Sequence, residues 1–212
     1  MDMIKDTLSK LKEQERELRQ TLIIEAARNV FGEKTYDQVS MAEIAKAAGI
    51  AKSSIYTYFS SQEELYARIV YQDACTFMQE LNHITRQKNV DAVKAAIDYF
   101  LDYYIEKHSQ WRMITHFALH GNNNMASIDK LNEIGRELMD TFERVFVQAG
   151  CRTGTRLLAH TLFSCLSGIL IAFRNYPGRS EQECISHIKK ISTQVEAMMK
   201  AYIAEQRSQG PE

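Results

Sequence analysis

The sequence is poor in the residues that interrupt helices. Only two prolines, Pro177 and Pro211, and nine glycines occur in 212 residues. Because proline and glycine are the main local breakers of helices, their scarcity favours long helices. No stretch alternates apolar and polar residues with a period of two for long enough to indicate a strand. These absences predict an all-α protein. The apolar patterns along the chain divide it into about nine predicted helices.

Cysteine pairs and metal-binding patterns are also missing. The four cysteines are scattered and form no CxxC pair, which is typical of reduced core residues in a cytosolic protein, with a redox-sensing thiol as the alternative. His116 and His120 stand four residues apart, a spacing that can chelate a metal. No nearby carboxylate or cysteine completes that set, so we expect no metal and no cofactor.

Membrane and secretion signals are weak. The longest apolar run, residues 157–173, contains His160, Ser164 and Ser167 and is short for a membrane span. It is predicted to be a buried helix. The first 20 residues are too charged for a signal peptide. The sequence thus predicts a cytoplasmic protein without a membrane partner.

The most informative segment is 39–65, VSMAEIAKAAGIAKSSIYTYFSSQEEL. Ser40 and Glu43 form a predicted capping box, which starts a short helix. Gly49 ends it, because glycine takes the left-handed conformation without a Cβ penalty. A second helix is predicted over 52–59, and Ser60 with Glu63 repeats the capping pattern before a longer helix. Two short helices joined by a tight turn suit the major groove of DNA, although an ordinary helical corner has the same pattern.

The outward side of the second helix favours DNA over a helical corner. Its predicted inward residues are Ile55 and Phe59, which leaves hydroxyls, tyrosines and a lysine on the other side. Such side chains are good donors to phosphates and base edges. The predicted base and phosphate contacts are Lys52, Ser53 and Tyr56, and further contacts, mainly to the phosphate backbone, are expected from Ser40, Ser54, Thr57 and Tyr58.

Residues 22–66 resemble the amino-terminal domain of TetR-type transcriptional regulators. The matching stretches are LIIEAARNVF (22–31), Tyr36, SMAEIAKAAGIAKSSIYTYF (40–59) and SQEELY (61–66). The resemblance implies a three-helix DNA-binding head, followed by a larger helical bundle that holds an inducer and dimerises. It covers about 45 of the 212 residues and implies nothing about the identity of the ligand.

Two positions depart from the family pattern. Thr35 stands where the family usually has glycine, and a β-branched residue disfavours positive φ, so the first helix is expected to end differently. Gln62 replaces the usual lysine, which generally meets a phosphate. Glutamine still donates a hydrogen bond but carries no charge. We therefore predict a DNA contact at Gln62 with weaker and less salt-dependent binding.

Net charge argues against DNA binding without excluding it. The chain has a formal charge of −1, and residues 1–66 hold nine Lys or Arg against eleven Asp or Glu. Local placement of charge matters more than the sum, and hydroxyls contact phosphates without charge. One weak head would not hold a site, so dimerisation is needed. The charged extension 1–19 is expected to be a frayed, solvated end, the alternative being a helix whose lysines follow the DNA backbone.

The predicted domains are 1–66 for DNA binding and 67–212 for ligand binding and dimerisation. The helices predicted after the helix-turn-helix span about 61–84, 91–107, 109–119, 127–148, 155–175 and 181–204, with a loop at 120–126 and a disordered tail at 205–212. The last two have one-sided apolar stripes, which favours a four-helix interface in a homodimer through about 155–175 and 181–204. The stripes are Leu158, Leu162, Cys165, Ile169 and Ala172 in the first of these helices and Ile185, Ile188, Ile191, Val195, Met198 and Tyr202 in the second. Two-fold symmetry would place the recognition helices about 34–36 Å apart on a palindromic operator.

Aromatic residues gather in the middle helices, where a small-molecule pocket needs apolar walls with a few polar groups. Core packing is the simpler explanation for each of them taken alone. The predicted pocket, for an unknown and largely apolar effector, is lined by Phe77, Tyr99, Tyr103, Tyr104, Trp111, His116, Phe117, Phe142 and Phe173.

Three classes of function are compatible with an all-α chain of this kind: an enzyme, a protein-binding module and a transcriptional regulator. An enzyme is disfavoured, because no nucleophile–base pair, phosphate loop or acidic pair stands out. A helical module that contacts another protein would explain the acidic sum of residues 1–66. The favoured function is a ligand-responsive regulator, predicted to be a repressor released from operator DNA when a small molecule binds the carboxy-terminal domain.

Overall fold

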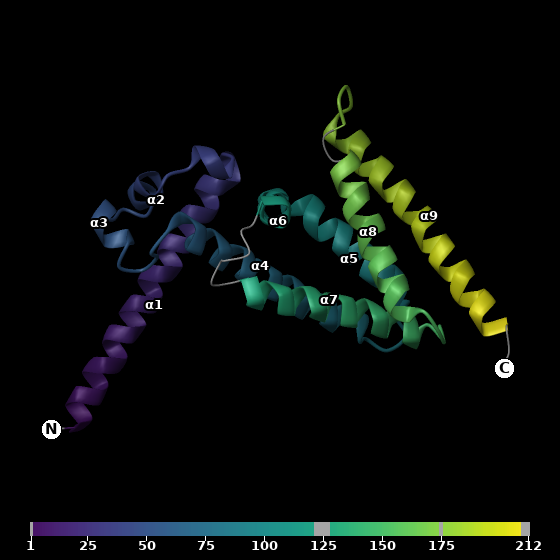
Figure 1. Ribbon diagram of the computed structural model, residues 1–212, viewed down its shortest axis with the longest axis horizontal. Helices are drawn as coiled ribbons and strands as arrows, with labels where there is room; N and C mark the ends of the chain where they lie inside the picture. The colour runs from purple at the N-terminus through teal and green to yellow at the C-terminus, as the bar shows by residue number, and fades with distance from the viewer. Residues whose placement is uncertain (1, 121–127, 174–175, 209–212) are drawn as a thin grey trace. The chain divides into compact units, whose positions relative to one another are not determined.

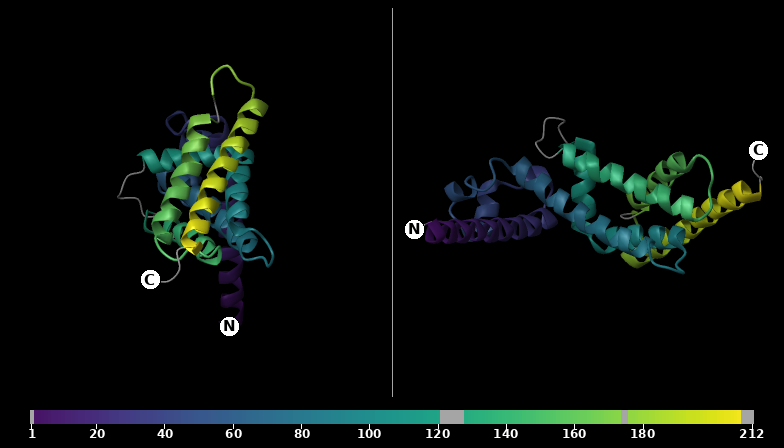
Figure 2. Two further views of the ribbon diagram at one scale, coloured as in Figure 1. Left: turned by 90° about the vertical axis from the view of Figure 1, so that its right-hand side faces the viewer. Right: turned by 90° about the horizontal axis from the view of Figure 1, so that it is seen from below.

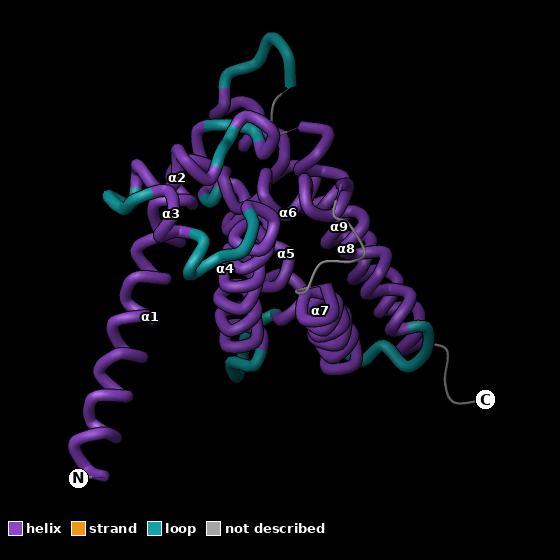
Figure 3. Tube along the Cα trace, turned by 60° about the vertical axis from the view of Figure 1, so that its left-hand side comes forward, coloured by secondary structure: helices purple, strands orange, loops and turns teal. Residues whose placement is uncertain are grey.

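The computed structural model describes residues 2–120, 128–173 and 176–208. Every regular element in these ranges is helical (Figure 3). The helices are α1 (Asp2–Glu33), η1 (Tyr36–Gln38, a 3-10 turn), α2 (Met41–Ala47), α3 (Lys52–Ile55), α4 (Gln62–Thr85), α5 (Ala92–Glu106), α6 (His108–His120), α7 (Ile128–Gln148), α8 (Thr155–Phe173) and α9 (Glu181–Ser208). The predicted all-α class is confirmed.

The chain forms two compact units that each contain a segment distant in sequence. The amino-terminal unit comprises Met1–Asp73 and His108–Asp129, and the carboxy-terminal unit comprises Ala74–Lys107 and Lys130–Glu212. Helix α4 supplies residues to both units, and α6 belongs to the first. The predicted division at residue 66 followed the motif alone and gave no indication that α6 packs with α1.

One side of α1 packs against other helices of the amino-terminal unit (Figure 1). Ile23, Ala27 and Phe31 are at most 2% exposed and recur at helical spacing, which gives α1 one apolar stripe. Helices α2 and α6 pack against α1. Leu22 is 51% exposed although it is apolar, whereas Ile24 is 5% exposed, so the buried side of α1 runs through Ile23 and Ile24.

Three boundaries differ from the predictions for local reasons. Helix α1 starts at Asp2, so residues 4–19 continue it rather than fray, with exposed side chains from residue 6 to residue 19. Regular helix α3 ends at Ile55, and residues 56–58 follow as turns, with Tyr58 N–H donating to the Ile55 carbonyl at 3.0 Å. The cap of α4 is Ser61, whose Oγ accepts from the Glu64 N–H at 3.0 Å. The predicted capping pair, Ser60 with Glu63, lies one residue earlier in the sequence.

The carboxy-terminal unit is organised around α5, which packs against both α8 and α9. Helices α8 and α9 also pack against each other and lie side by side in the two views of Figure 2. Asp91 caps α5 by accepting the Lys94 N–H at 3.1 Å, as the sequence predicts. Helix α9 continues to Ser208, four residues into the predicted disordered tail. The predicted loop residues 121–126, and residues 174–175 and 209–212, lie outside the described ranges.

Candidate nucleic-acid interface and effector region

The turn between α2 and α3 has the geometry that its sequence predicts. Ser40 Oγ accepts the Glu43 N–H at 3.3 Å and so caps α2. Gly49 has φ +68°, the left-handed conformation that favours glycine. The Ile50 N–H donates to the Ala45 carbonyl at 3.0 Å, which closes the turn. The Glu43 carboxylate pairs with Lys34 instead of completing a capping box.

Residues 52–58, which we call the recognition segment, are held by two buried neighbours. Ile55 is fully buried and Phe59 is 4% exposed, so these side chains fix the segment to the core. Lys52, Ser53 and Thr57 are exposed, and Tyr56 is 47% exposed, whereas Ser54 and Tyr58 are half-buried. Ser40 is also exposed. The segment thus presents a surface of hydroxyls, one phenol and one ammonium, all of which can donate to phosphate or base edges.

Arg19 is a functional candidate that the sequence patterns missed. Hydrogen bonding to Glu15 and the charge and hydrogen-bond interaction with Tyr58 raise the pKa of Arg19. Its Nη2 donates to Glu15 at 2.8 Å. The interaction between Arg19 and Tyr58 joins the helical extension to the end of the recognition segment. No spacing rule connects residues 19 and 58, so only the folded chain shows their proximity.

The two departures from the family pattern have structural explanations. Thr35 has φ −72° and caps η1, so this helix end needs no positive φ and tolerates a β-branched residue. Gln62 is half-buried, and its Nε2 donates to the Tyr36 carbonyl at 2.9 Å. One N–H of the Gln62 amide is therefore engaged within the protein, and the second N–H is left for another acceptor.

Helix α6 is hydrogen-bonded to α4 and to the end of α1. The Tyr66 hydroxyl donates to the Met113 carbonyl at 3.0 Å, and the Arg112 guanidinium donates to the carbonyls of Phe31 and Gly32. Burial raises the pKa of Tyr66, which keeps this hydroxyl a donor. Backbone carbonyls at the end of a helix need such partners, so Arg112 replaces a capping residue.

The predicted effector residues divide between the two units. Trp111, 9% exposed, and His116, which stacks on Tyr36 at 5.0 Å between ring centroids, lie in the amino-terminal unit. The side chain of Phe117 lies outside the described residues. Phe173, in the other unit, stacks on Tyr176 and meets the His187 ring at 4.9 Å. The sequence offered no way to see this division, because all these residues fall in similar apolar patterns.

One subset does form a cluster. Phe77 lies 5.3 Å from Tyr99, 5.0 Å from Tyr103 and 5.3 Å from Tyr104, measured between ring centroids. Phe100 joins them and extends the contact to the fully buried Phe142 at 6.3 Å. Burial raises the pKa of Tyr99, with further contributions from Tyr103 and Glu80. We call Phe77, Tyr99, Phe100, Tyr103 and Tyr104 the aromatic cluster.

Helices α8 and α9 keep part of their apolar surface exposed. In the most apolar 18-residue window of α8, only 28% of the residues are buried. By length and composition this helix is also long and apolar enough to cross a membrane, a test that core helices of other proteins pass too. We call the exposed side the outer face of α8–α9, and its apolar members include Leu157 (73% exposed), Ile171 (67%), Met198 (68%) and Tyr202 (41%).

The outer face corrects the predicted stripes. Leu162, Ile169, Ile188 and Val195 belong to the stripes that the sequence assigned to a dimer interface, but they are buried within the protomer. Met198 and Tyr202, from the same stripe of α9, remain exposed, and residues 157–173 form a helix that is buried on one side only. Ser164 and Gly168 lie between Leu157 and Ile171 at helical spacing and are exposed, so another helix can approach closely there.

Comparison with known proteins identifies the amino-terminal unit. Residues 23–69 match the model of the bacterial regulatory proteins of the tetR family. These residues form a TetR-family DNA-binding domain. It is 31% identical over 94 residues to the uncharacterized HTH-type transcriptional regulator YfiR of Bacillus subtilis, an alignment that spans 44% of each chain.

Solved structures of TetR-like regulators share the fold over most of the chain. FadR from Bacillus subtilis, crystallised with stearoyl-CoA, has a TM-score of 0.68 at 20% identity, with 86% of this chain and 98% of that chain covered. AibR in complex with isovaleryl coenzyme A and operator DNA has a TM-score of 0.63 at 19% identity, with 80% and 95% covered. The helix-turn-helix described above is thus that of a TetR-family transcriptional regulator.

Proposed function

We propose that this protein is a ligand-responsive repressor that binds a palindromic operator as a homodimer and leaves it when an acyl-coenzyme A binds the carboxy-terminal domain. The observation that carries the proposal is the recognition segment. Its apolar residues are anchored in the core, while Lys52, Ser53, Tyr56 and Thr57 remain exposed on a helix-turn-helix. Side chains of this kind position and specify DNA contacts in the major groove.

The outer face of α8–α9 supports the dimer. Four large apolar side chains that are 41–73% exposed are unusual on two neighbouring helices of a protomer that remains alone. Packing the same face of a second copy would bury them around a two-fold axis, in a self-complementary interface. The aligned heads would then meet two half-sites about 34–36 Å apart.

The effector class is suggested by the similar structures. FadR and AibR were solved with acyl-coenzyme A ligands. In this chain the aromatic cluster offers an apolar environment for an acyl chain, with the tyrosine hydroxyls as polar groups. The rings pack closely, so an acyl chain would have to displace some of them. That displacement would couple ligand binding to DNA binding, since a ligand shifts an equilibrium only through differential affinity.

Fluorescence anisotropy with labelled DNA from beside the gene tests the proposal. We expect sequence-dependent and salt-sensitive binding, which falls at least about tenfold when Lys52 and Tyr56 are both replaced by alanine. Lys107→Ala, which removes an exposed lysine from the other unit, should bind like the wild type. Titration with fatty acyl-CoA should release the DNA. Equal binding by the double variant and the wild type would refute the role of the recognition segment, and DNA retained at saturating acyl-CoA would refute the effector.

A further inference from the structure

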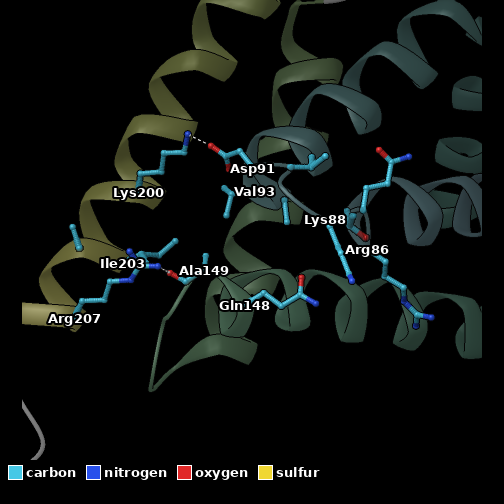
Figure 4. A pocket seen from close by; sticks show the side chains of 14 residues that line it. Arg86, Lys88, Asp91, Val93, Gln148, Ala149, Lys200, Ile203 and Arg207 are labelled. Atoms are coloured by element: carbon cyan, nitrogen blue, oxygen red, sulfur yellow. Dashed lines mark hydrogen bonds and ion pairs between the residues drawn. The ribbon is translucent and has the colours of Figure 1, made fainter.

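A cleft of about 570 Å³ lies in the carboxy-terminal unit, and no residue of the aromatic cluster lines it (Figure 4). It is formed by the last turn of α4 and the loop after it, the start of α5, the end of α7 and the last turns of α9. This volume is in the range of small-molecule sites, about 300–1,000 Å³. The sequence did not predict the cleft, because its walls come from three segments that are distant in sequence, 85–93, 148–149 and 200–207.

The lining is strongly basic. Arg86, Lys88, Lys200 and Arg207 line the cleft, with Asp91 as the one lining carboxylate. Lys200 is neutralised by ion pairs with Asp91 and with Glu196, the latter at 2.6 Å. Within the described ranges, Arg86, Lys88 and Arg207 form no ion pair. Three positive charges are therefore left without a counter-charge around one cavity.

The local backbone holds one of these cations in place. The Arg207 guanidinium donates to the Ala149 carbonyl, which is drawn as a dashed line in Figure 4. It also lies against Gly150, where a Cβ would collide with it. Gly150 has φ +87° and terminates α7. The glycine thus serves the helix end and makes room for the arginine.

A further cation, Arg144, interacts with Arg86 but does not line the cleft. Arg144 donates to Asn82 Oδ1 at 3.1 Å and to Thr141 Oγ1 at 3.0 Å. Burial lowers the pKa of Arg144 and the positive charge of Arg86 lowers it further, whereas the charges of Asp140 and Glu137 raise it. Like charges held together destabilise one another, and a bound anion would relieve that repulsion.

The remaining lining is apolar. Val93 and Ile203 are 2% and 4% exposed and form the floor, while Val90 is 39% exposed at the rim. Gln87 and Gln148 add hydrogen-bonding amides. This combination suits an organic molecule with charged phosphates at one end, because arginine binds phosphate oxygens in a bidentate manner and apolar walls hold the rest.

We propose that this basic cleft binds the phosphate groups of a small phosphorylated molecule, with Arg86, Lys88 and Arg207 contacting the phosphates. The inference rests on the proposed function for the identity of the ligand, which would be the coenzyme A portion of the effector. The organic part next to the phosphates lies over Val90, Val93 and Ile203. Phosphate recognition itself depends only on the charges of the cleft.

Isothermal titration calorimetry of the full-length protein tests the assignment. The ligands are coenzyme A, inorganic pyrophosphate and pantetheine, which has no phosphate, and each is measured at low and at physiological salt. We expect coenzyme A and pyrophosphate to bind, with weaker binding at higher salt. Pantetheine should not bind measurably. Coenzyme A binding without pyrophosphate binding, or equal binding of pantetheine, would overturn the role of the phosphates.

Variants locate the site. Arg86→Gln with Lys88→Gln should weaken coenzyme A and pyrophosphate binding by at least about tenfold, because two charge-assisted contacts are lost. Lys107→Gln removes an exposed lysine from the same unit and should change binding less than about twofold. Both substituted positions in the cleft are exposed, so thermal unfolding should be unchanged. A double variant that binds like the wild type would overturn the proposal.

Operator release separates this inference from the proposed function. If acyl-CoA releases DNA equally from the wild type and from the double variant, the cleft assignment fails and the effector stands. If coenzyme A binds in the cleft but no acyl-CoA releases DNA, the effector fails and the cleft assignment stands. If the double variant loses operator affinity without any ligand, the cations contact nucleic acid instead, and the cleft assignment is wrong.

Discussion

The recognition segment and the outer face of α8–α9 both leave side chains exposed, but of opposite kinds. The segment exposes Lys52, Ser53 and Thr57 together with Tyr56. The outer face exposes Leu157, Ile171 and Met198 together with Tyr202. Polar donors on a rigid helix suit a charged, hydrated partner such as DNA, whereas apolar side chains suit a dry protein surface. In each region the buried side of the helix fixes the position of the exposed side.

The largest effect is expected where a charge enters the outer face. Leu157→Glu with Ile171→Glu would bury two carboxylates in the proposed dimer, at a cost of about 5 kcal/mol or more. We therefore expect a monomer in analytical ultracentrifugation and loss of operator binding, although the recognition segment is unchanged. Thr193→Glu, on another exposed side of α9, should remain dimeric. If the double variant sediments as the wild type does, this face is not the interface.

A smaller but still large effect is expected beneath the recognition segment. Ile55 is fully buried, and Ile55→Ala would remove its packing at a cost of about 2–5 kcal/mol. Urea unfolding followed by circular dichroism should show this loss in the amino-terminal unit. Val147→Ala, at a position 54% exposed on α7, should cost little. A loss under about 1 kcal/mol for Ile55→Ala would contradict its role as an anchor.

Much of the head was predictable because its signals are local. Ser40 and Gly49 act on backbone atoms a few residues away, so the sequence alone predicts the turn that the structure contains. Periodicity also identified every long helix. It did not show that Leu22 and Met198 remain exposed in the protomer, however, because a stripe of apolar residues on a helix does not say which edge meets the core.

The effector region was less predictable because it depends on contacts between distant segments. Trp111 and His116 are aromatic, like the members of the aromatic cluster, but they lie in the other unit, where His116 stacks on Tyr36. Arg86 and Arg207 are separated by most of the chain and meet only at the cleft. Nothing in their sequence neighbourhood distinguishes them from ordinary surface cations.

A third test removes a hydroxyl from each surface and compares the two. Tyr56→Phe should weaken operator binding by about threefold to tenfold, because one phosphate or base hydrogen bond is lost. Tyr202→Phe should leave dimerisation and operator binding unchanged, since the ring supplies the apolar contact on the outer face. Anisotropy and sedimentation measure the two outcomes. A reversed result, with Tyr202→Phe impairing assembly and Tyr56→Phe silent, would exchange the roles assigned to the two tyrosines.

The smallest expected effect concerns an ion pair that belongs to neither surface. Burial acts to raise the pKa of Asp91, but hydrogen bonds from Lys200 and from the Lys94 N–H outweigh it and lower the pKa below its ordinary value of 3.8. A carboxyl with a lowered folded-state pKa stabilises the protein above the ordinary value, and this stabilisation is lost as the pH falls through the folded-state pKa.

Asp91→Asn keeps a side-chain oxygen that can cap α5 but removes the charge that pairs with Lys200. Because the pair is partly exposed, we expect a loss of about 0.5 kcal/mol at neutral pH. The loss should shrink as the pH falls below 3.8 through the lowered pKa, where the wild-type carboxyl becomes neutral as well. Urea unfolding at several pH values measures it. A loss of the same size at every pH would mean that the cap, rather than the charge, is responsible.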